Sequence, residues 1–179
     1  LFRSVADNFA SAQSVAELPG NMAAGHVRYS TAGGASMRNI QPLYADLASG
    51  GFAVAHNGNI SNARKLRQEL VEKGAIFQST SDTEVIIHLV ATSRYPTMLD
   101  KLVDALRLVE GAYALIVMTP KGMMACRDPL GIRPLVMGKM GDAIVFASET
   151  VALDVAGAEF VRQIEPGEFV EVDFTGAIH

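Results

Sequence analysis

The spacing of apolar residues divides the chain into a mixed N-terminal part, a helical middle and a C-terminal part of short runs. In the middle, apolar residues from Ile60 to Val71 lie on one helical face, and Gly74 is typical of a helix end. The same spacing predicts further helices over 85–90 and 99–106. We therefore expect successive helices that each bury one face.

Short apolar runs bounded by turn residues predict strands on both sides of these helices. The N-terminal part predicts a helix over 4–18, strands over 22–31 and 51–56, and a polar, glycine-rich loop over 31–42. The C-terminal part predicts a helix over 149–156 and strands over 112–119, 122–127, 133–139, 143–148, 160–164 and 167–174. Strands, then adjacent helices, then strands indicate an α+β fold, not alternating βαβ units.

Composition is that of an ordinary globular domain. The chain has 179 residues, of which 49% are hydrophobic and 19% charged, enough for one domain with a sizeable core. The net charge of -4 and the interspersed charges favour neither a nucleic-acid nor a membrane partner. A single cysteine, Cys126, excludes an intrachain disulfide and fits the cytoplasm. Because the first residue is Leu1, we expect a piece of a longer protein.

The dipeptide Asn57-Gly58 follows a predicted strand and precedes residues with helical spacing. A hairpin would need a second strand here, so we predict a strand-to-helix junction with outward-facing N–H groups. The Asn57 amide and the Gly58 N–H would then be two donors suited to an oxyanion. A simpler interpretation is that Asn57 only caps a turn.

Two charged residues could hold the ends of a free amino acid. Arg28 ends a predicted strand, and its guanidinium could grip a carboxylate with two hydrogen bonds. Asp82 lies in Ser81-Asp82-Thr83-Glu84, which has the spacing of a capping box, and could hold an ammonium group. Surface pairing of Arg28 and a helix-dipole role for Asp82 are the structural alternatives.

The remaining chemistry-bearing residues favour structural roles. Three of the four histidines, His26, His56 and His88, have no zinc-site spacing. The stretch 127–134, RDPLGIRP, is typical of a rigid turn whose charges pair internally. Cys126 is interpreted as a buried structural thiol.

Several motifs in this order resemble the glutaminase domain of the amidophosphoribosyltransferases. They are GHVRYSTAGG, QPL, AHNGNISNARKLR, QSTSDTEVIIHL, EGAYALIVM, RDPLGIRPL, ASET and EPGE, within about 20–172. The resemblance implies a class II glutamine amidotransferase of the N-terminal-nucleophile type. Its fold would be a four-layer αββα sandwich of two antiparallel sheets flanked by helices, here without its first strands.

The resemblance also implies roles for individual residues. Asn57 and Gly58 would form the oxyanion hole. Arg28 would hold the α-carboxylate of glutamine, Asp82 its α-ammonium group, and Thr31 would line the glutamine site. The family's nucleophile is a cysteine at the mature N-terminus, which Leu1 and Cys126 do not match. We therefore expect residues 1–179 to be a type 2 amidotransferase domain, incomplete at its N-terminus and inactive alone.

In the parent enzyme, ammonia from glutamine would react with phosphoribosyl pyrophosphate to give 5-phosphoribosylamine, the first committed step of purine synthesis. A C-terminal phosphoribosyltransferase domain would bind magnesium, whereas this domain would need no metal or other cofactor. The parent is expected to be a homo-oligomer, and an iron–sulfur cluster in it stays open. Two alternatives stay open as well: a non-catalytic regulatory module on the same scaffold, and the glutaminase domain of another class II enzyme such as glucosamine-fructose-6-phosphate aminotransferase.

Overall fold

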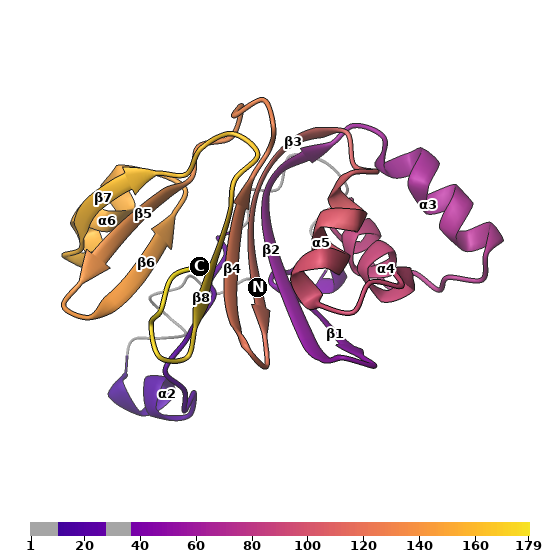
Figure 1. Cartoon of the computed structure of the whole chain (residues 1–179). Helices are drawn as coiled ribbons and strands as arrows, with labels where there is room; N and C mark the ends of the chain where they lie inside the picture. The colour runs from indigo at the N-terminus through magenta and orange to yellow at the C-terminus, as the bar shows by residue number, and fades with distance from the viewer. Residues whose placement is uncertain (1–10, 28–36) are drawn as a thin grey trace.

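A computed structural model of the chain describes residues 11–27 and 37–179. Its strands form two antiparallel sheets that lie between helices (Figure 1). In chain order the elements are α2 (Ala12–Ala16), the 3₁₀ helix η1 (Met37–Asn39), β1 (Leu43–Leu47), β2 (Gly50–Ile60), α3 (Ala63–Glu72), α4 (Glu84–Thr92), α5 (Met98–Leu106), β3 (Gly111–Thr119), β4 (Gly122–Arg127), β5 (Val136–Met140), β6 (Ala143–Ala147), α6 (Thr150–Ala156), β7 (Glu159–Gln163) and β8 (Phe169–Asp173).

The larger sheet has the strand order β1-β2-β3-β4-β8, and every neighbouring pair in it is antiparallel. The inner strand β2 pairs with the central strand β3 along most of its length, from Ala53 opposite Met118 to Ile60 opposite Gly111. Its pairing with β1 is shorter and ends where Val54 faces Leu43. Among residues 11–27 and 37–179, the second half of β2 therefore has a sheet neighbour on one side only.

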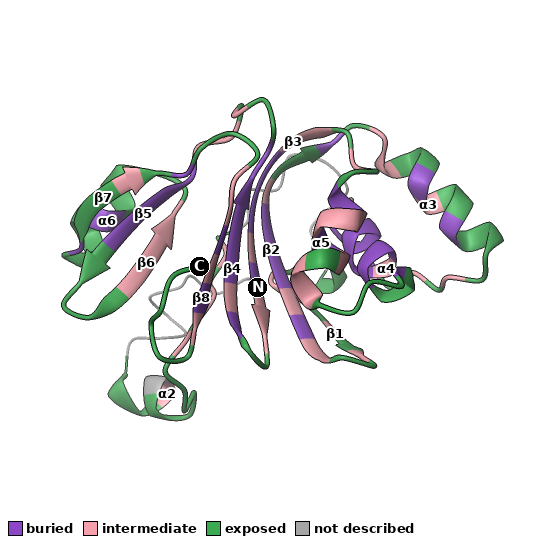
Figure 2. Cartoon of the chain, viewed as in Figure 1, coloured by how far each residue is buried: buried purple, intermediate pink, exposed green. Residues whose placement is uncertain are grey.

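Helices α3, α4 and α5 cover one face of this sheet. Their apolar faces pack on alternate residues of β2 and β3, such as Phe52, Val54 and Leu115, which are completely buried. Figure 2 shows the buried positions along the central strands and on the sheet-facing sides of the helices. Complete burial of such side chains contributes roughly 1.5–3 kcal/mol each, so this cluster is the main core.

The other face of the larger sheet packs on the smaller sheet, whose strand order is β6-β5-β7. Side chains from both sheets, including Ala125, Met137 and Val170, form a second buried cluster between them. Helix α6 covers the outer face of the smaller sheet through the fully buried Leu153, and it ends at Gly157 in a left-handed conformation, with φ of 72°. The four-layer αββα arrangement and the α+β class are therefore confirmed.

The N-terminal strand assignments are partly wrong. Residues 22–27, the described part of the strand predicted over 22–31, form no strand. Strand β1 was not predicted, although Leu43 and Leu47 alternate with the exposed Tyr44 as in an edge strand. The polar residues before it and the short apolar run concealed this alternation.

The predicted capping box at 81–84 does not form. Helix α4 begins at Glu84 with Thr83 as its N-cap residue, and Ser81 Oγ accepts from the Thr83 N–H at 3.3 Å instead of from the Glu84 N–H. The Glu84 carboxylate instead accepts hydrogen bonds from the N–H groups of Gln78 and Ser79, both at 2.7 Å. Burial would raise the pKa of Glu84, but these bonds outweigh it and lower the pKa. The Glu84 carboxylate therefore stabilises the loop that precedes α4.

None of the helices in the described part of the chain is both long enough and apolar enough to cross a membrane.

Candidate active site

Asn57 and Gly58 lie inside β2, not at a strand-to-helix junction. They face Ala114 and Tyr113 of β3, and α3 begins only at Ala63. The prediction that a helix N-terminus leaves their N–H groups free is therefore wrong, because the strand continues to Ile60. Which backbone N–H groups of this dipeptide can bind a ligand depends on how β2 pairs with its neighbouring strands.

The geometry of the β2–β3 ladder turns the Gly58 N–H toward the edge of β2 that β1 leaves uncovered. The Tyr113 carbonyl accepts from the Asp128 N–H at 2.8 Å, on the side of β3 away from β2. Gly58 and Tyr113 are therefore a non-hydrogen-bonded pair, and both N–H groups point away from each other. The Gly58 N–H points to the side where β1 has already ended.

The neighbouring N–H groups on the same edge confirm this direction. The His56 N–H donates to Gln41 Oε1 at 2.6 Å, and the Ile60 N–H donates to Asp82 Oδ2 at 2.9 Å. Gly58 lies between them, and no side-chain acceptor for its N–H is found among residues 11–27 and 37–179. A backbone donor on an open strand edge is what an oxyanion requires.

Gly58 also has to be glycine for steric reasons. A Cβ at this position would collide with the Ala112 carbonyl oxygen and would lie 2.8 Å from His56 Nε2. Because the Ala112 oxygen belongs to the sheet backbone, it cannot move aside as a flexible side chain can. The dipeptide therefore combines a side-chain amide with a backbone that neighbouring atoms approach closely.

The Asn57 side chain is held by two polar partners from distant parts of the chain. Its Oδ1 accepts from Arg133 Nη2 at 2.5 Å, and its Nδ2 donates to Ser148 Oγ at 3.3 Å. The amide carries two N–H groups, so one stays available for a ligand. Asn57 does not cap a turn, which excludes the simpler interpretation of this residue.

Asp82 contacts β2 on both sides of the dipeptide. Its carboxylate accepts from Ile60 N–H and approaches His56 Nδ1 at 3.9 Å, and its side chain remains 28% exposed. A partly exposed carboxylate with spare lone pairs can still bind an ammonium group. No hydrogen bond joins Asp82 to Asn57 in the described ranges, and the two side chains bind different partners.

His56 is a buried neutral histidine. Burial lowers its pKa, and the nearby Asp82 opposes this shift without reversing it. Its Nδ1 lies 3.0 Å from Thr83 Oγ1, which fixes the ring against the start of α4. Its buried Nε2 has no hydrogen-bond partner among the described residues, so the satisfied, purely structural role predicted for this histidine stays a prediction.

Arg28 and Thr31 lie outside the described residues. Their predicted contacts with glutamine, and therefore a clamp formed by Arg28 and Asp82, stay predictions.

The turn 127–134 is rigid, but its charges do not pair with each other as predicted. Asp128 is completely buried and accepts from the N–H groups of Leu130, Ile132 and Arg133 at 3.0–3.1 Å. Arg127 donates to three backbone carbonyls. Both charges therefore bind the backbone, which sequence spacing does not reveal.

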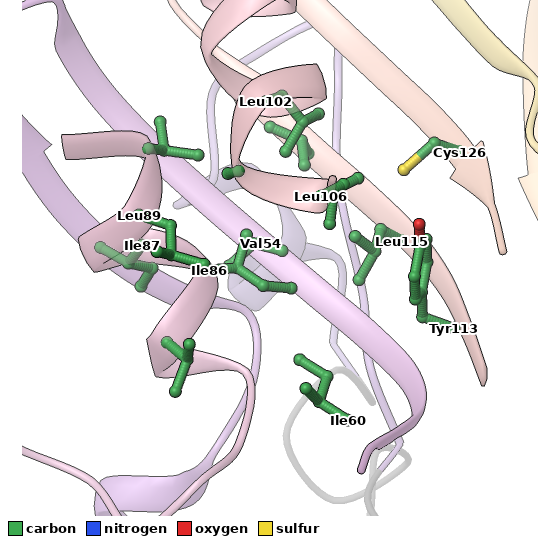
Figure 3. Close-up of a cluster of buried hydrophobic side chains, with 14 of the residues drawn as sticks. Val54, Ile60, Ile86, Ile87, Leu89, Leu102, Leu106, Tyr113, Leu115 and Cys126 are labelled. Carbon is green, nitrogen blue, oxygen red and sulfur yellow. The ribbon is translucent and has the colours of Figure 1, made fainter. Parts of the chain in front are cut away.

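Cys126 is sealed in the main core. It lies in β4 opposite Leu115, and Figure 3 shows its sulfur among the buried side chains. It is 1% exposed, and burial strongly raises the pKa of its thiol. A protonated thiol without access to solvent cannot attack a substrate, so the structural role predicted for Cys126 is confirmed.

Two hollows border this region. The smaller one, of about 330 Å³, is lined by Asp82 together with Ala63, Arg64, Arg67 and Thr80. The larger one, of about 840 Å³, runs along β1 and α4 and touches none of Asn57, Gly58 and Asp82. In the ranges that the structure describes, no group of three or more His, Cys, Asp or Glu side chains could hold a metal ion.

Comparison with protein families identifies the family to which this chain belongs. A model of the glutamine amidotransferase domain family matches residues 26–155, which include Asn57, Gly58 and Asp82. The chain belongs to this family. The amidotransferase domain is 49% identical to an amidophosphoribosyltransferase of Rhizobium etli, over 97% of this chain and 36% of the relative.

Solved structures give the same picture. The domain superposes on the glutamine phosphoribosylpyrophosphate amidotransferase of Bacillus subtilis, complexed with ADP and GMP, with a TM-score of 0.80 and 45% identity. That match covers 86% of this chain and 33% of the other. An allosteric regulatory enzyme of purine biosynthesis matches with a TM-score of 0.81 and 47% identity, over 86% of this chain and 34% of the other. This amidotransferase domain thus spans about a third of the length of the relatives it matches.

Sequence reasoning missed Gln41, Arg133 and Ser148, which all contact β2 in the site. Arg133 and Ser148 belong to motifs that carried the family resemblance, RDPLGIRPL and ASET. The sequence therefore marked these two residues but assigned them no role in the site. Gln41, just before β1, belongs to a third such motif, QPL, which likewise had no role attached.

Proposed function

We propose that this chain is the glutamine-hydrolysing part of an amidophosphoribosyltransferase. The observation that carries the proposal is the pair of donors in β2: the Gly58 N–H on the uncovered strand edge and the second N–H of the Asn57 amide. The similarity to amidophosphoribosyltransferases across nearly the whole chain supports the same conclusion.

In the proposed reaction, a thiolate attacks the side-chain amide carbon of glutamine. The negative charge that develops on the carbonyl oxygen is stabilised by Asn57 and Gly58. The amide nitrogen then takes a proton and leaves as ammonia, and water hydrolyses the thioester to glutamate and the free thiol. Because Cys126 is buried, the thiolate is assigned to a residue outside these 179, an N-terminal cysteine with its α-amino group as base.

Glutamine would be held at its other end by Asp82 and Arg28. Asp82 would bind the α-ammonium group and Arg28 the α-carboxylate, with Thr31 lining the site. Asp82 and Asn57 bind different partners and so can act on different ends of glutamine, whose α-carbon lies several bonds from the reacting amide.

Ammonia would pass to a phosphoribosyltransferase domain of the same polypeptide. There it would displace pyrophosphate from phosphoribosyl pyrophosphate and form 5-phosphoribosylamine, with magnesium bound in that domain. We propose no metal or other cofactor for the amidotransferase domain, and a homo-oligomer for the complete enzyme.

The test is Asn57→Ala in the complete enzyme, assayed with glutamine and separately with ammonia as the nitrogen donor. We expect glutamine-dependent kcat to fall about 10²-fold or more with little change in KM, because one oxyanion donor is lost. Ammonia-dependent synthesis should stay unchanged, which controls for folding.

Normal glutamine-dependent kcat in the Asn57→Ala enzyme would refute the oxyanion assignment. An unmodified complete protein without glutaminase activity would support the non-catalytic module instead. Glutaminase activity whose ammonia is transferred only to a sugar phosphate would support the glucosamine-type alternative.

A further inference from the structure

Two motifs without an assigned role meet at the Asn57 side chain. Arg133, from RDPLGIRPL, donates to Asn57 Oδ1, and Ser148, from ASET, accepts from Asn57 Nδ2. They are 76 and 91 residues away from Asn57 along the chain. The tertiary fold therefore brings two separate turns to the one amide that stabilises the proposed oxyanion.

The first of these turns is built to hold Arg133 in place. The buried Asp128 carboxylate accepts the N–H of Arg133 at 3.0 Å, and Arg127 Nε donates to the Arg133 carbonyl at 2.7 Å. Burial would raise the pKa of Asp128, but its bonds from backbone N–H groups outweigh this effect and lower the pKa. The carboxylate therefore stays charged, and the backbone of Arg133 is fixed on both sides.

The contact of Arg133 with Asn57 selects one orientation of the amide. Arginine has only donors, so an amide that faces it must present its oxygen. If the amide were rotated by half a turn, its NH₂ group would face the guanidinium, donor against donor. Arg133 thereby keeps Nδ2 on the opposite side, where it can donate.

The charge of Arg133 has a second consequence. A cation bound to the amide oxygen polarises the amide and makes its N–H groups stronger donors. Ser148 contributes less, because its hydroxyl is exposed, lies at 3.3 Å and is neutral.

We propose that Arg133 is a positioning residue that fixes and polarises the Asn57 amide for oxyanion stabilisation, with Ser148 as a weaker second support. The inference rests on the proposed glutaminase function. It gives a role to the RDPLGIRPL turn, which touches the site through Arg133.

The test is a double-mutant cycle in the complete enzyme with Arg133→Met and Asn57→Ala. Arg133→Met alone should lower glutamine-dependent kcat about tenfold, the worth of one charge-assisted hydrogen bond, and change KM less than about twofold. In the Asn57→Ala background, Arg133→Met should change kcat by less than about twofold, because no amide is left to orient.

Three further variants separate positioning from a general structural effect. Arg133→Lys should recover part of kcat, since it keeps the charge and loses the guanidinium geometry. Ser148→Ala should lower kcat less than Arg133→Met. Arg162→Met is the matched control, because Arg162 forms its ion pair with Glu168 and should leave kcat unchanged. Ammonia-dependent activity reports the folding of each variant.

The outcomes distinguish the two proposals. A full tenfold loss from Arg133→Met in the Asn57→Ala background would overturn positioning through Asn57. Loss of kcat in Asn57→Ala with normal kcat in Arg133→Met would overturn this inference and leave the proposed function intact. Normal kcat in Asn57→Ala would instead overturn the proposed function itself.

Discussion

The two halves of β2 share one strand and one sheet but have different hydrogen-bond partners. From Gly50 to Val54 the strand pairs with β1 on one side, and from Ala53 onward it also pairs with β3 on the other. From His56 to Ile60 it keeps β3, and its other edge faces the side chains of Gln41 and Asp82. Backbone groups that a neighbouring strand satisfies in the first half are available to side chains or ligands in the second.

The difference shows how an antiparallel sheet can carry a reaction site without breaking a strand. The pairing of β1 with β2 stops at the Leu43–Val54 pair. This is enough to free alternate N–H groups in the rest of β2. The helix-covered core beneath the first half holds the strand in place, so the free donors need no mobile loop. We therefore expect the first half to govern stability and the second half to govern the proposed chemistry.

The largest effect should come from Phe52→Ala in the first half. Phe52 is completely buried under the helices, so its truncation leaves a cavity and should lower the free energy of unfolding by about 3–5 kcal/mol. Urea unfolding of the 179-residue chain measures this. The folded fraction of the complete enzyme should keep its glutamine KM, and a changed KM would contradict the division between the halves.

Asp82→Asn tests the second half, where stability and binding should separate. Asparagine keeps an oxygen that can accept from the Ile60 N–H, so the unfolding free energy should change little. It loses the negative charge for the ammonium group, so glutamine KM should rise about tenfold or more. Steady-state kinetics of the complete enzyme measures this, and ammonia-dependent activity is the control. An unchanged KM would remove Asp82 from the glutamine site.

The overall fold followed from sequence because long periodic segments are buried on one face. The predicted helix from Ile60 to Val71 corresponds to α3, where Leu66 and Leu70 are buried and Val71 is exposed. The six C-terminal strands were located for the same reason. Edge strand β1 was missed because every second residue in it is exposed and polar residues precede it, which conceals its short apolar run.

The site was predicted only in part. The position of Asn57 and Gly58 on a strand edge depends on where β1 ends, and that is a property of strand pairing. The contact between Arg133 and Asn57 joins residues 76 positions apart, so no local spacing could indicate it. Family resemblance identified the residues, whereas only the tertiary structure shows how their donors are freed and oriented.

A smaller effect is expected from pH, because His56 in the second half of β2 is buried. Its pKa is lowered in the folded state, so the unfolded chain binds more protons as the pH falls below about 6.5, and stability should decrease. Between pH 6.5 and 5.5 one such group can cost at most about 1.4 kcal/mol. Unfolding free energies at pH 5.5 and 7.5 should show a smaller difference in His56→Gln than in the unmodified chain. An equal difference would mean that His56 does not contribute.

The smallest effect on catalysis should come from Cys126→Ala. Cys126 lies in β4, away from the open edge of β2, and packs with Leu115 and Tyr113 in the main core. Its thiol stays protonated because burial raises its pKa, and it has no access to glutamine. Removal of the sulfur should cost roughly 1 kcal/mol of stability through lost packing and leave glutamine-dependent kcat unchanged.

The decisive comparison is ammonia release by the 179-residue chain and by the complete enzyme, each with and without Cys126→Ala. We expect release from the complete enzyme alone, in both forms. Release from the 179-residue chain that disappeared with Cys126→Ala would make Cys126 the nucleophile, and the division between a structural and a chemical part of the sheet would fail.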